Sequence, residues 1–136
     1  MKVSTKGRYA LRMMVDLAEH DDGEYIRLKD IAIRQEISEK YLEIILKKLV
    51  KGNILKGARG KGGGYMLTRL PKDYTVGEII ELTEGSLAPV ACLMPGADAC
   101  PRKDKCATLP LWEKYNALIR DFFYQITLED LINNNF

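Results

Sequence analysis

The chain has 136 residues, 46% of them hydrophobic and 29% charged, which suits one globular domain and argues against a disordered chain. Its formal net charge of +2 hides an asymmetry: residues 1–70 hold 15 Lys/Arg against 9 Asp/Glu, and residues 71–136 hold 6 against 10. The basic first half predicts contact with a polyanion.

The first 36 residues predict a long helix, a small strand and a short helix. A helix is expected over residues 4–20, because apolar side chains recur there at i, i+3, i+4 and i+7. These side chains are Leu11, Met14, Val15 and Ala18. A short strand is expected at 25–28 and a short helix at 28–36.

A third helix and a hairpin follow. Ser38 is a good N-cap for this helix, and Gly52 and Asn53 suit its end. Its apolar stripe consists of Leu42, Ile45, Leu46 and Leu49. Strand-like pieces at 54–58 and 65–68 flank a glycine-rich tip, which predicts a hairpin.

The second half predicts further helices on both sides of a loop. One helix is expected at 75–85, where Thr75 and Glu78 have capping-box spacing, and another at 127–132, where Thr127 and Asp130 have the same spacing. A long helix is expected at 109–126. It is apolar around too much of its circumference to be buried by its own domain alone, so the same helix of a second copy is its predicted neighbour.

These elements predict a mainly α fold with a small β-hairpin wing, that is, a winged helix-turn-helix plus a long C-terminal dimerisation helix. We expect residues 1–70 to form the DNA-binding domain. Residues 71–136 are expected to hold a sensor loop (92–106) and the dimerisation helices.

The second helix of a helix-turn-helix places its N-terminal residues in the major groove of DNA. The residues so predicted to contact DNA are Ser38, Glu39, Lys40, Tyr41 and Glu43, with Lys47 following along the phosphates. At the glycine-rich tip, Arg59 and Lys61 have little bulk around them and are predicted to reach the backbone or the minor groove. An ordinary solvated helix face and an ordinary flexible turn are the alternatives.

All three cysteines, Cys92, Cys100 and Cys106, lie in the loop 92–106. The chain shows no signal-peptide core and no apolar run of membrane-spanning length, so we expect a cytoplasmic protein with reduced thiols and no membrane partner. Metal binding or thiol redox chemistry then explains the loop better than disulfides. No nucleophile–base pair or substrate motif is recognisable, so an enzyme with a small-molecule substrate is not expected, and a small redox metalloprotein is the weaker alternative.

Five stretches resemble, in order along the chain, the Rrf-type family of bacterial winged-helix transcriptional regulators. They are STKGRYAL (4–11), ISEKYLEIILKKL (37–49), ARGKGGGYML (58–67), GEIIELTEG (77–85) and TLEDL (127–131). The resemblance implies a homodimeric repressor that binds a double-stranded DNA operator. It also implies that the helix from Ser38 reads the major groove, that Arg59 enters the minor groove, and that the helix 109–126 forms the dimer.

The same resemblance implies an iron–sulfur cluster, because the iron–sulfur members of the family carry three cysteines in this loop. The cluster would be held by Cys92, Cys100 and Cys106, because thiolates suit iron–sulfur centres. A 2Fe–2S cluster is expected in preference to 4Fe–4S. Zinc or cluster-free thiol redox sensing is the alternative. The fourth ligand is unknown: Leu109 stands where these members have a histidine, and Arg8 and Arg12 stand where others have acidic residues or histidine.

Overall fold

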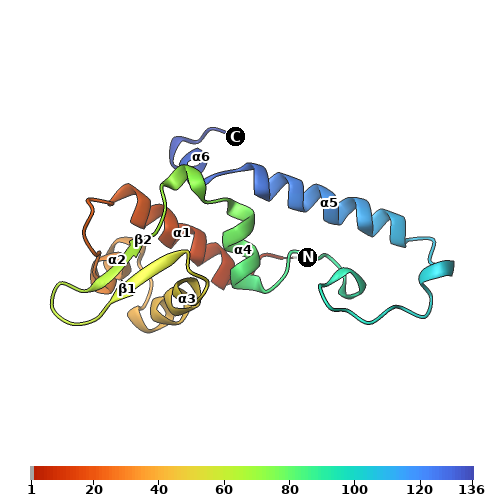
Figure 1. The fold of residues 1–136 in the computed structure, drawn as a ribbon, viewed down its shortest axis with the longest axis horizontal. Coiled ribbons are helices and arrows are strands. Elements are labelled where there is room, and N and C mark those ends of the chain that lie inside the picture. Colours follow the sequence, from red (N-terminus) through yellow and green to blue (C-terminus); the bar gives the residue numbers. More distant parts are fainter. Residues whose placement is uncertain (1) are drawn as a thin grey trace.

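The computed structural model describes residues 2–136, and its elements follow the expected order (Figure 1). The helices are α1 (Thr5–Glu19), α2 (Leu28–Gln35), α3 (Glu39–Lys51), α4 (Val76–Glu84), α5 (Leu109–Gln125) and α6 (Leu128–Asn133). The strands β1 (Leu55–Ala58) and β2 (Gly64–Leu67) pair antiparallel, with Leu55 opposite Leu67. The predicted mainly α fold with a hairpin wing is confirmed. Among residues 2–136, no helix is both long and apolar enough to cross a membrane.

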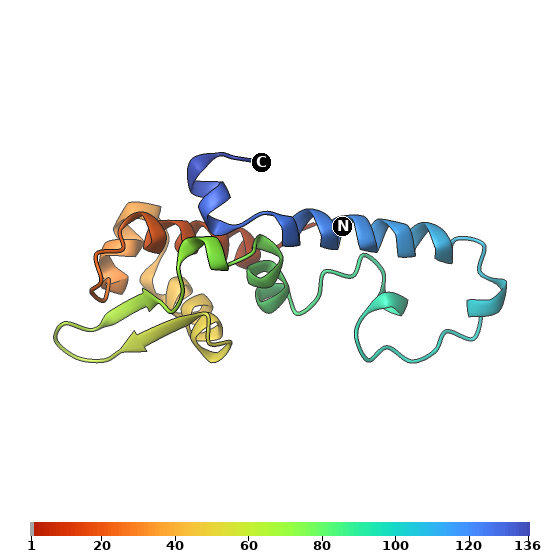
Figure 2. The same cartoon turned by 45° about the horizontal axis from the view of Figure 1, so that its top comes forward.

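The molecule has two distinct ends. Helices α1 to α4 and the hairpin gather at one end, and α5 runs away from them toward the loop that connects α4 to α5 (Figures 1 and 2). The tip of the hairpin and the cysteine loop therefore lie at opposite ends of the chain's long axis. Helix α6 returns to pack on α1.

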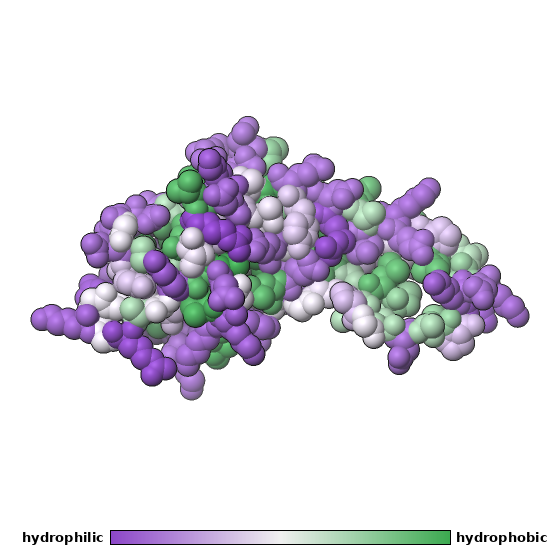
Figure 3. Space-filling view, in the orientation of Figure 1, coloured by the Kyte–Doolittle hydropathy of each residue, from purple (hydrophilic) through white to green (hydrophobic). Residues whose placement is uncertain are grey.

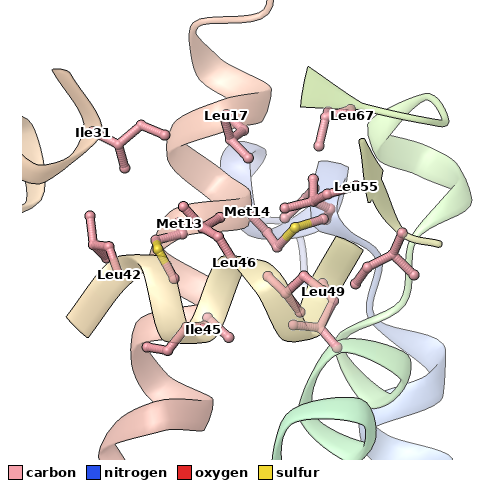
Figure 4. Packing of buried hydrophobic residues seen from close by; sticks show 14 of the residues in the cluster. Met13, Met14, Leu17, Ile31, Leu42, Ile45, Leu46, Leu49, Leu55 and Leu67 are labelled. Carbon is pink, nitrogen blue, oxygen red and sulfur yellow. The ribbon is translucent and has the colours of Figure 1, made fainter. Parts of the chain in front are cut away.

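The core of the winged end forms where α3 crosses α1 (Figure 4). The predicted stripe of α3 is fully buried: Leu42, Ile45, Leu46 and Leu49 are at most 1% exposed. The prediction for α1 was shifted by one residue, because Met13 and Leu17 are buried beside Met14, whereas Leu11 and Val15 are only partly buried. Two layers cover α1: α2 and α3 pack on it, and so do α4 and α6. Its buried face is therefore wider than one stripe.

The strand predicted at 25–28 is wrong in extent. Only Ile26 pairs with the hairpin, through two backbone hydrogen bonds with Tyr65 of 2.9 and 2.8 Å. The next residue, Arg27, is already the N-cap of α2, so the chain turns into the helix at once. Gly64 makes this pairing possible, because its φ is +143° and a Cβ there would collide with the Ile26 carbonyl oxygen.

One of the predicted capping boxes forms only in half. The Thr75 hydroxyl accepts a hydrogen bond from the Glu78 backbone N–H at 3.1 Å, as expected. The Glu78 carboxylate does not return to Thr75, because it accepts two hydrogen bonds from Arg69, at 2.8 and 2.7 Å. The acidic side chain thus ties α4 to the segment after the wing instead of capping its own helix.

Asp16 is the buried charge of the winged end, with 1% exposure. Its carboxylate accepts hydrogen bonds from Arg34 at 3.0 and 2.7 Å and from Gln35 at 2.8 Å, which join α1 to α2. Burial acts to raise the pKa of Asp16, but the hydrogen bonds from Arg34 and Gln35 outweigh it and hold this pKa below its ordinary value.

Asp16→Asn is expected to lower the free energy of unfolding by about 2–3 kcal/mol at pH 7. This is less than for a fully buried pair, because Arg34 remains partly in water. The folded-state pKa is depressed, so the stabilisation is complete above the unfolded-state pKa of roughly 4 and is lost as pH falls through the folded-state value. Urea unfolding at several pH values should show that the difference in free energy of unfolding between Asp16→Asn and wild type becomes smaller below about pH 4. The exposed Asp22→Asn serves as control, and an unchanged difference at pH 3 would contradict the assignment.

Candidate nucleic-acid interface and candidate metal centre

The turn between α2 and α3 has helix-turn-helix geometry. Glu36 ends α2 in the left-handed conformation with φ 55°, and the buried Ile37 anchors the turn in the core. Ser38 then caps α3, its hydroxyl accepting a hydrogen bond from the Tyr41 backbone N–H at 3.2 Å. The polar start of α3 consequently points outward from a fixed turn.

Most of the residues predicted to contact DNA are exposed on α3 or at its N-cap. They are Ser38, Glu39, Lys40, Glu43 and Lys47. Lys47 and Glu43 form an ion pair of 3.3 Å, with 70% and 48% of their side chains exposed. Such a solvated pair is weak, so both groups remain available to a ligand.

Tyr41 differs from its neighbours because it is half-buried. Its ring packs edge-on against Tyr9 of α1, with 5.7 Å between ring centroids. This contact fixes the position of Tyr41 between α1 and α3.

A basic groove lies between α1, α3 and the end of α4, where Lys6 and Lys48, which sequence reasoning missed, join the predicted phosphate contact Lys47. Four lysines line it: Lys6, Lys47, Lys48 and Lys51. The Lys48 ammonium donates to the Thr83 carbonyl oxygen at 3.1 Å, which ties α3 to α4. Lys6 and Lys48 are far apart in the sequence and come together only where α1 and α3 cross.

The wing presents its two cations at the tip. Arg59 and Lys61 are exposed, and within residues 2–136 neither forms an ion pair. Gly60 and Gly62 have φ values of +84° and +81°, so the tight tip requires glycine there. Hydrophilic side chains project from this end of the molecule (Figure 3).

At the opposite end, the loop and the start of α5 enclose an open hollow. All three cysteines line it, so the structure brings the predicted ligands to one site. The other lining residues are Leu93, Ala97, Asp98, Ala99, Lys103, Leu109 and Glu113. The thiols are free. In the described part of the chain, no three His, Cys, Asp or Glu side chains converge closely enough to hold a metal ion. Three soft donors on one hollow fit a thiophilic centre chemically, and the loop must close further to ligate one.

Cys106 has the chemistry of a ligand. Its Sγ lies 3.4 Å from the Thr108 hydroxyl, and this hydrogen bond lowers the pKa of the Cys106 thiol. Backbone N–H groups of Thr108 and Leu109 and the charge of Arg102 lower it further. A lower pKa favours the thiolate, which is the form that binds iron or zinc.

Arg8 and Arg12, at positions where relatives carry a ligand, and His20, the chain's single histidine, contact other groups. Arg12 donates to the Gln35 side chain at 3.1 Å and lies over the Tyr9 ring. Arg8 donates to Thr5, and His20 contacts the Asp16 carbonyl oxygen at 2.8 Å. None of the three lines the hollow, whereas Glu113, which sequence reasoning did not single out, does.

Helix α5 buries only one of its two apolar sides. Ile119 and Ile126 are 8% and 7% exposed, and Phe123 packs in one cluster with Ile126 and the α4 residues Val76 and Ile80. The other side consists of Leu111, Tyr115, Leu118 and Phe122, which are 58%, 41%, 68% and 54% exposed. We call these four residues the α5 stripe. Their spacing of four, three and four residues is that of a helix-to-helix seam.

Helix α4 joins α5 to the winged end. Gly77 lets the Tyr124 ring pack directly on the α4 backbone, since a Cβ there would collide with the ring. Glu81 accepts hydrogen bonds from Arg120 at 2.9 Å and from the Tyr124 hydroxyl. At the end of α4, Glu84 accepts from the Ser4 backbone N–H at 2.9 Å and from its hydroxyl at 2.6 Å.

Comparison with known proteins gives consistent matches over the whole chain. Residues 3–134 match the Rrf2 family model, which describes an iron-dependent transcriptional regulator. The HTH-type transcriptional regulator IscR of Pectobacterium carotovorum is 37% identical over 134 residues, covering 98% of this chain and 80% of that protein.

Two solved structures share the architecture. CymR, the global cysteine regulator of B. subtilis, superposes with a TM-score of 0.77 at 34% identity, covering 100% of this chain and 99% of that one. IscR of T. potens superposes with a TM-score of 0.74 at 36% identity, covering 98% and 88%. The likeness therefore extends from the winged end through α5.

Proposed function

The chain belongs to the Rrf2 family of transcriptional regulators, and we propose that it is a homodimeric repressor controlled by an iron–sulfur cluster. It is a regulator and not an enzyme, like its relatives. The observation that carries the proposal is the layout of the molecule. Exposed cations at the wing tip lie at one end, and three cysteines around one hollow lie at the other.

The DNA-binding surface combines α3, the basic groove and the wing. Exposed side chains at the start of α3, among them Lys40 and Glu43, would contact base edges in the major groove of an operator. The basic groove would follow the phosphates. Arg59 would enter the adjacent minor groove, with Lys61 beside it, because negative potential is greatest there.

A second copy of the chain would cover the α5 stripe. Four large apolar side chains in a row, each more than 40% exposed, are a costly surface to leave in water. Their seam-like spacing is self-complementary, which suits a two-fold pair of α5 helices. Such a pair would present two copies of α3 to one operator.

The three cysteines would hold the cluster, preferably of the 2Fe–2S type. When bound, such a cluster supplies redox chemistry and iron lability that thiols alone lack. It can control DNA binding only if the DNA-binding and non-binding arrangements hold it with different free energies. Helix α4 gives a physical connection, because it precedes the loop, packs on α5 and bonds to α1 and α3.

A cluster-free regulator that uses the same thiols with zinc or by oxidation is the second candidate. The lowered pKa of Cys106 favours it, since a thiolate both binds zinc and is oxidised readily.

Arg59→Ala is expected to weaken operator binding by about 1–3 kcal/mol, roughly a 5- to 150-fold rise in Kd. The slope of log Kd against log salt concentration should fall by about 1 if the guanidinium also neutralises a phosphate. Fluorescence anisotropy with a duplex selected from random DNA by the wild-type protein measures both. Lys72→Ala, an exposed cation outside this surface, is the control. An unchanged Kd for Arg59→Ala would remove the wing from the interface.

A further inference from the structure

The hollow contains one acidic side chain that comes from a regular helix. Glu113 of α5 lines it together with Cys92, Cys100 and Cys106. Glu113 is exposed, and throughout residues 2–136 it takes part in none of the ion pairs. Its carboxylate is therefore available to bind a metal centre that the thiols hold.

The direction of the helix brings this carboxylate toward the cysteines. Side chains on a helix point toward its N-terminus and cover the preceding turn. Leu109 lies one turn before Glu113, on the same face, and also lines the hollow. Since Cys106 precedes Leu109 by three residues, the Glu113 side chain extends over the part of α5 that adjoins Cys106, where Leu109 itself has no donor atom.

We propose that Glu113 supplies the fourth protein ligand, through a carboxylate oxygen, to the centre held by Cys92, Cys100 and Cys106. The inference rests on the proposed cluster. A 2Fe–2S cluster takes four protein ligands, and the chain has only three cysteines. Lys103 lines the same hollow, and its ammonium would offset part of the negative charge of three thiolates and a carboxylate.

Asp98 is the competing carboxylate, because it lines the hollow as well. It lies in the irregular part of the loop that must move for the thiols to converge, whereas Glu113 is fixed on α5. A ligand on a rigid element is held more closely in position. A ligand on α5 also connects cluster occupancy directly with the helix that carries the α5 stripe.

The test compares five proteins purified without oxygen: wild type, Glu113→Ala, Glu113→Gln, Glu113→Cys and Asp98→Asn. The readouts are iron and sulfide per chain, visible circular dichroism, and the rate of iron loss to a chelator. We expect Glu113→Ala and Glu113→Gln to lose iron at least about tenfold faster, by analogy with weakened metal sites, and to change the dichroism. Glu113→Cys should retain iron with a spectrum shifted by the added thiolate, and Asp98→Asn should match wild type.

Each further outcome has a defined meaning. Wild-type iron content, spectrum and loss rate in both Glu113→Ala and Glu113→Gln would overturn the role of Glu113, and so would iron loss confined to Asp98→Asn. Wild-type protein without iron and sulfide would overturn the cluster itself, and Glu113's role with it. Glu113 is exposed and packs in no core cluster, so the iron-free variants should unfold at the temperature of iron-free wild type. Thermal unfolding therefore checks that misfolding is not the cause of iron loss.

Discussion

Leu118→Glu is expected to convert the proposed dimer to a monomer. Leu118 is the most exposed member of the α5 stripe, at 68%. In a two-fold pair of α5 helices the substitution would place two carboxylates in an apolar seam, where burying an unpaired charge costs several kcal/mol. Light scattering during size exclusion measures the change in mass. Because a monomer contacts one half-site only, operator affinity should fall by about 10²–10⁴-fold.

Leu70→Glu is the matched control for this substitution. Leu70 is 60% exposed and lies between the wing and α4, away from the α5 stripe. It should leave both the mass and the affinity unchanged. A dimer that persists in Leu118→Glu, with wild-type affinity, would show that the α5 stripe is covered by something other than a second copy.

Cys100→Ala is expected to abolish the cluster. Removing one of three thiolates leaves too few soft ligands, so the protein should purify colourless, without iron or labile sulfide. Its operator affinity should equal that of iron-free wild type and differ from that of the loaded protein by about 5- to 150-fold, the usual range of coupling between two sites. Anaerobic purification with metal analysis and anisotropy measures both quantities.

Met94→Ala is the control for the cysteine substitution, because it removes an exposed sulfur side chain from the same loop. It should keep wild-type iron. Colourless wild-type protein with one zinc ion per chain would contradict the cluster and favour the zinc-dependent alternative.

Periodicity and capping determine what the sequence alone could predict of the fold. The stripe from Leu42 to Leu49 and the Ser38 cap are local patterns, and α3 lies where they place it. The box of Thr127 and Asp130 likewise forms completely at the start of α6. The strand at 25–28 failed, since its extent depends on a partner strand and on the early start of α2.

The candidate site divides in the same way. The cysteines and the wing cations were visible in the sequence, because each group lies within one short segment. The basic groove and Glu113 were not, since Lys6 meets Lys48 only through the packing of α1 on α3, and Glu113 meets the cysteines only because the loop folds back on α5. Lys6, Lys48 and Glu113 are therefore recognisable as site residues only from tertiary contacts.

The packing of Tyr124 on Gly77 has a mechanical consequence. This contact lies near the C-terminal end of α5, and Leu109 lies 15 residues away, which at 1.5 Å per residue is a lever of roughly 20 Å. A tilt of about 5° at Gly77 moves the distant end of the helix by roughly 2 Å over that length. Conversely, a 2 Å displacement of the start of α5 corresponds to only a few degrees of rotation about the Gly77 contact, so a small change at the winged end is enlarged where α5 meets the cysteine loop.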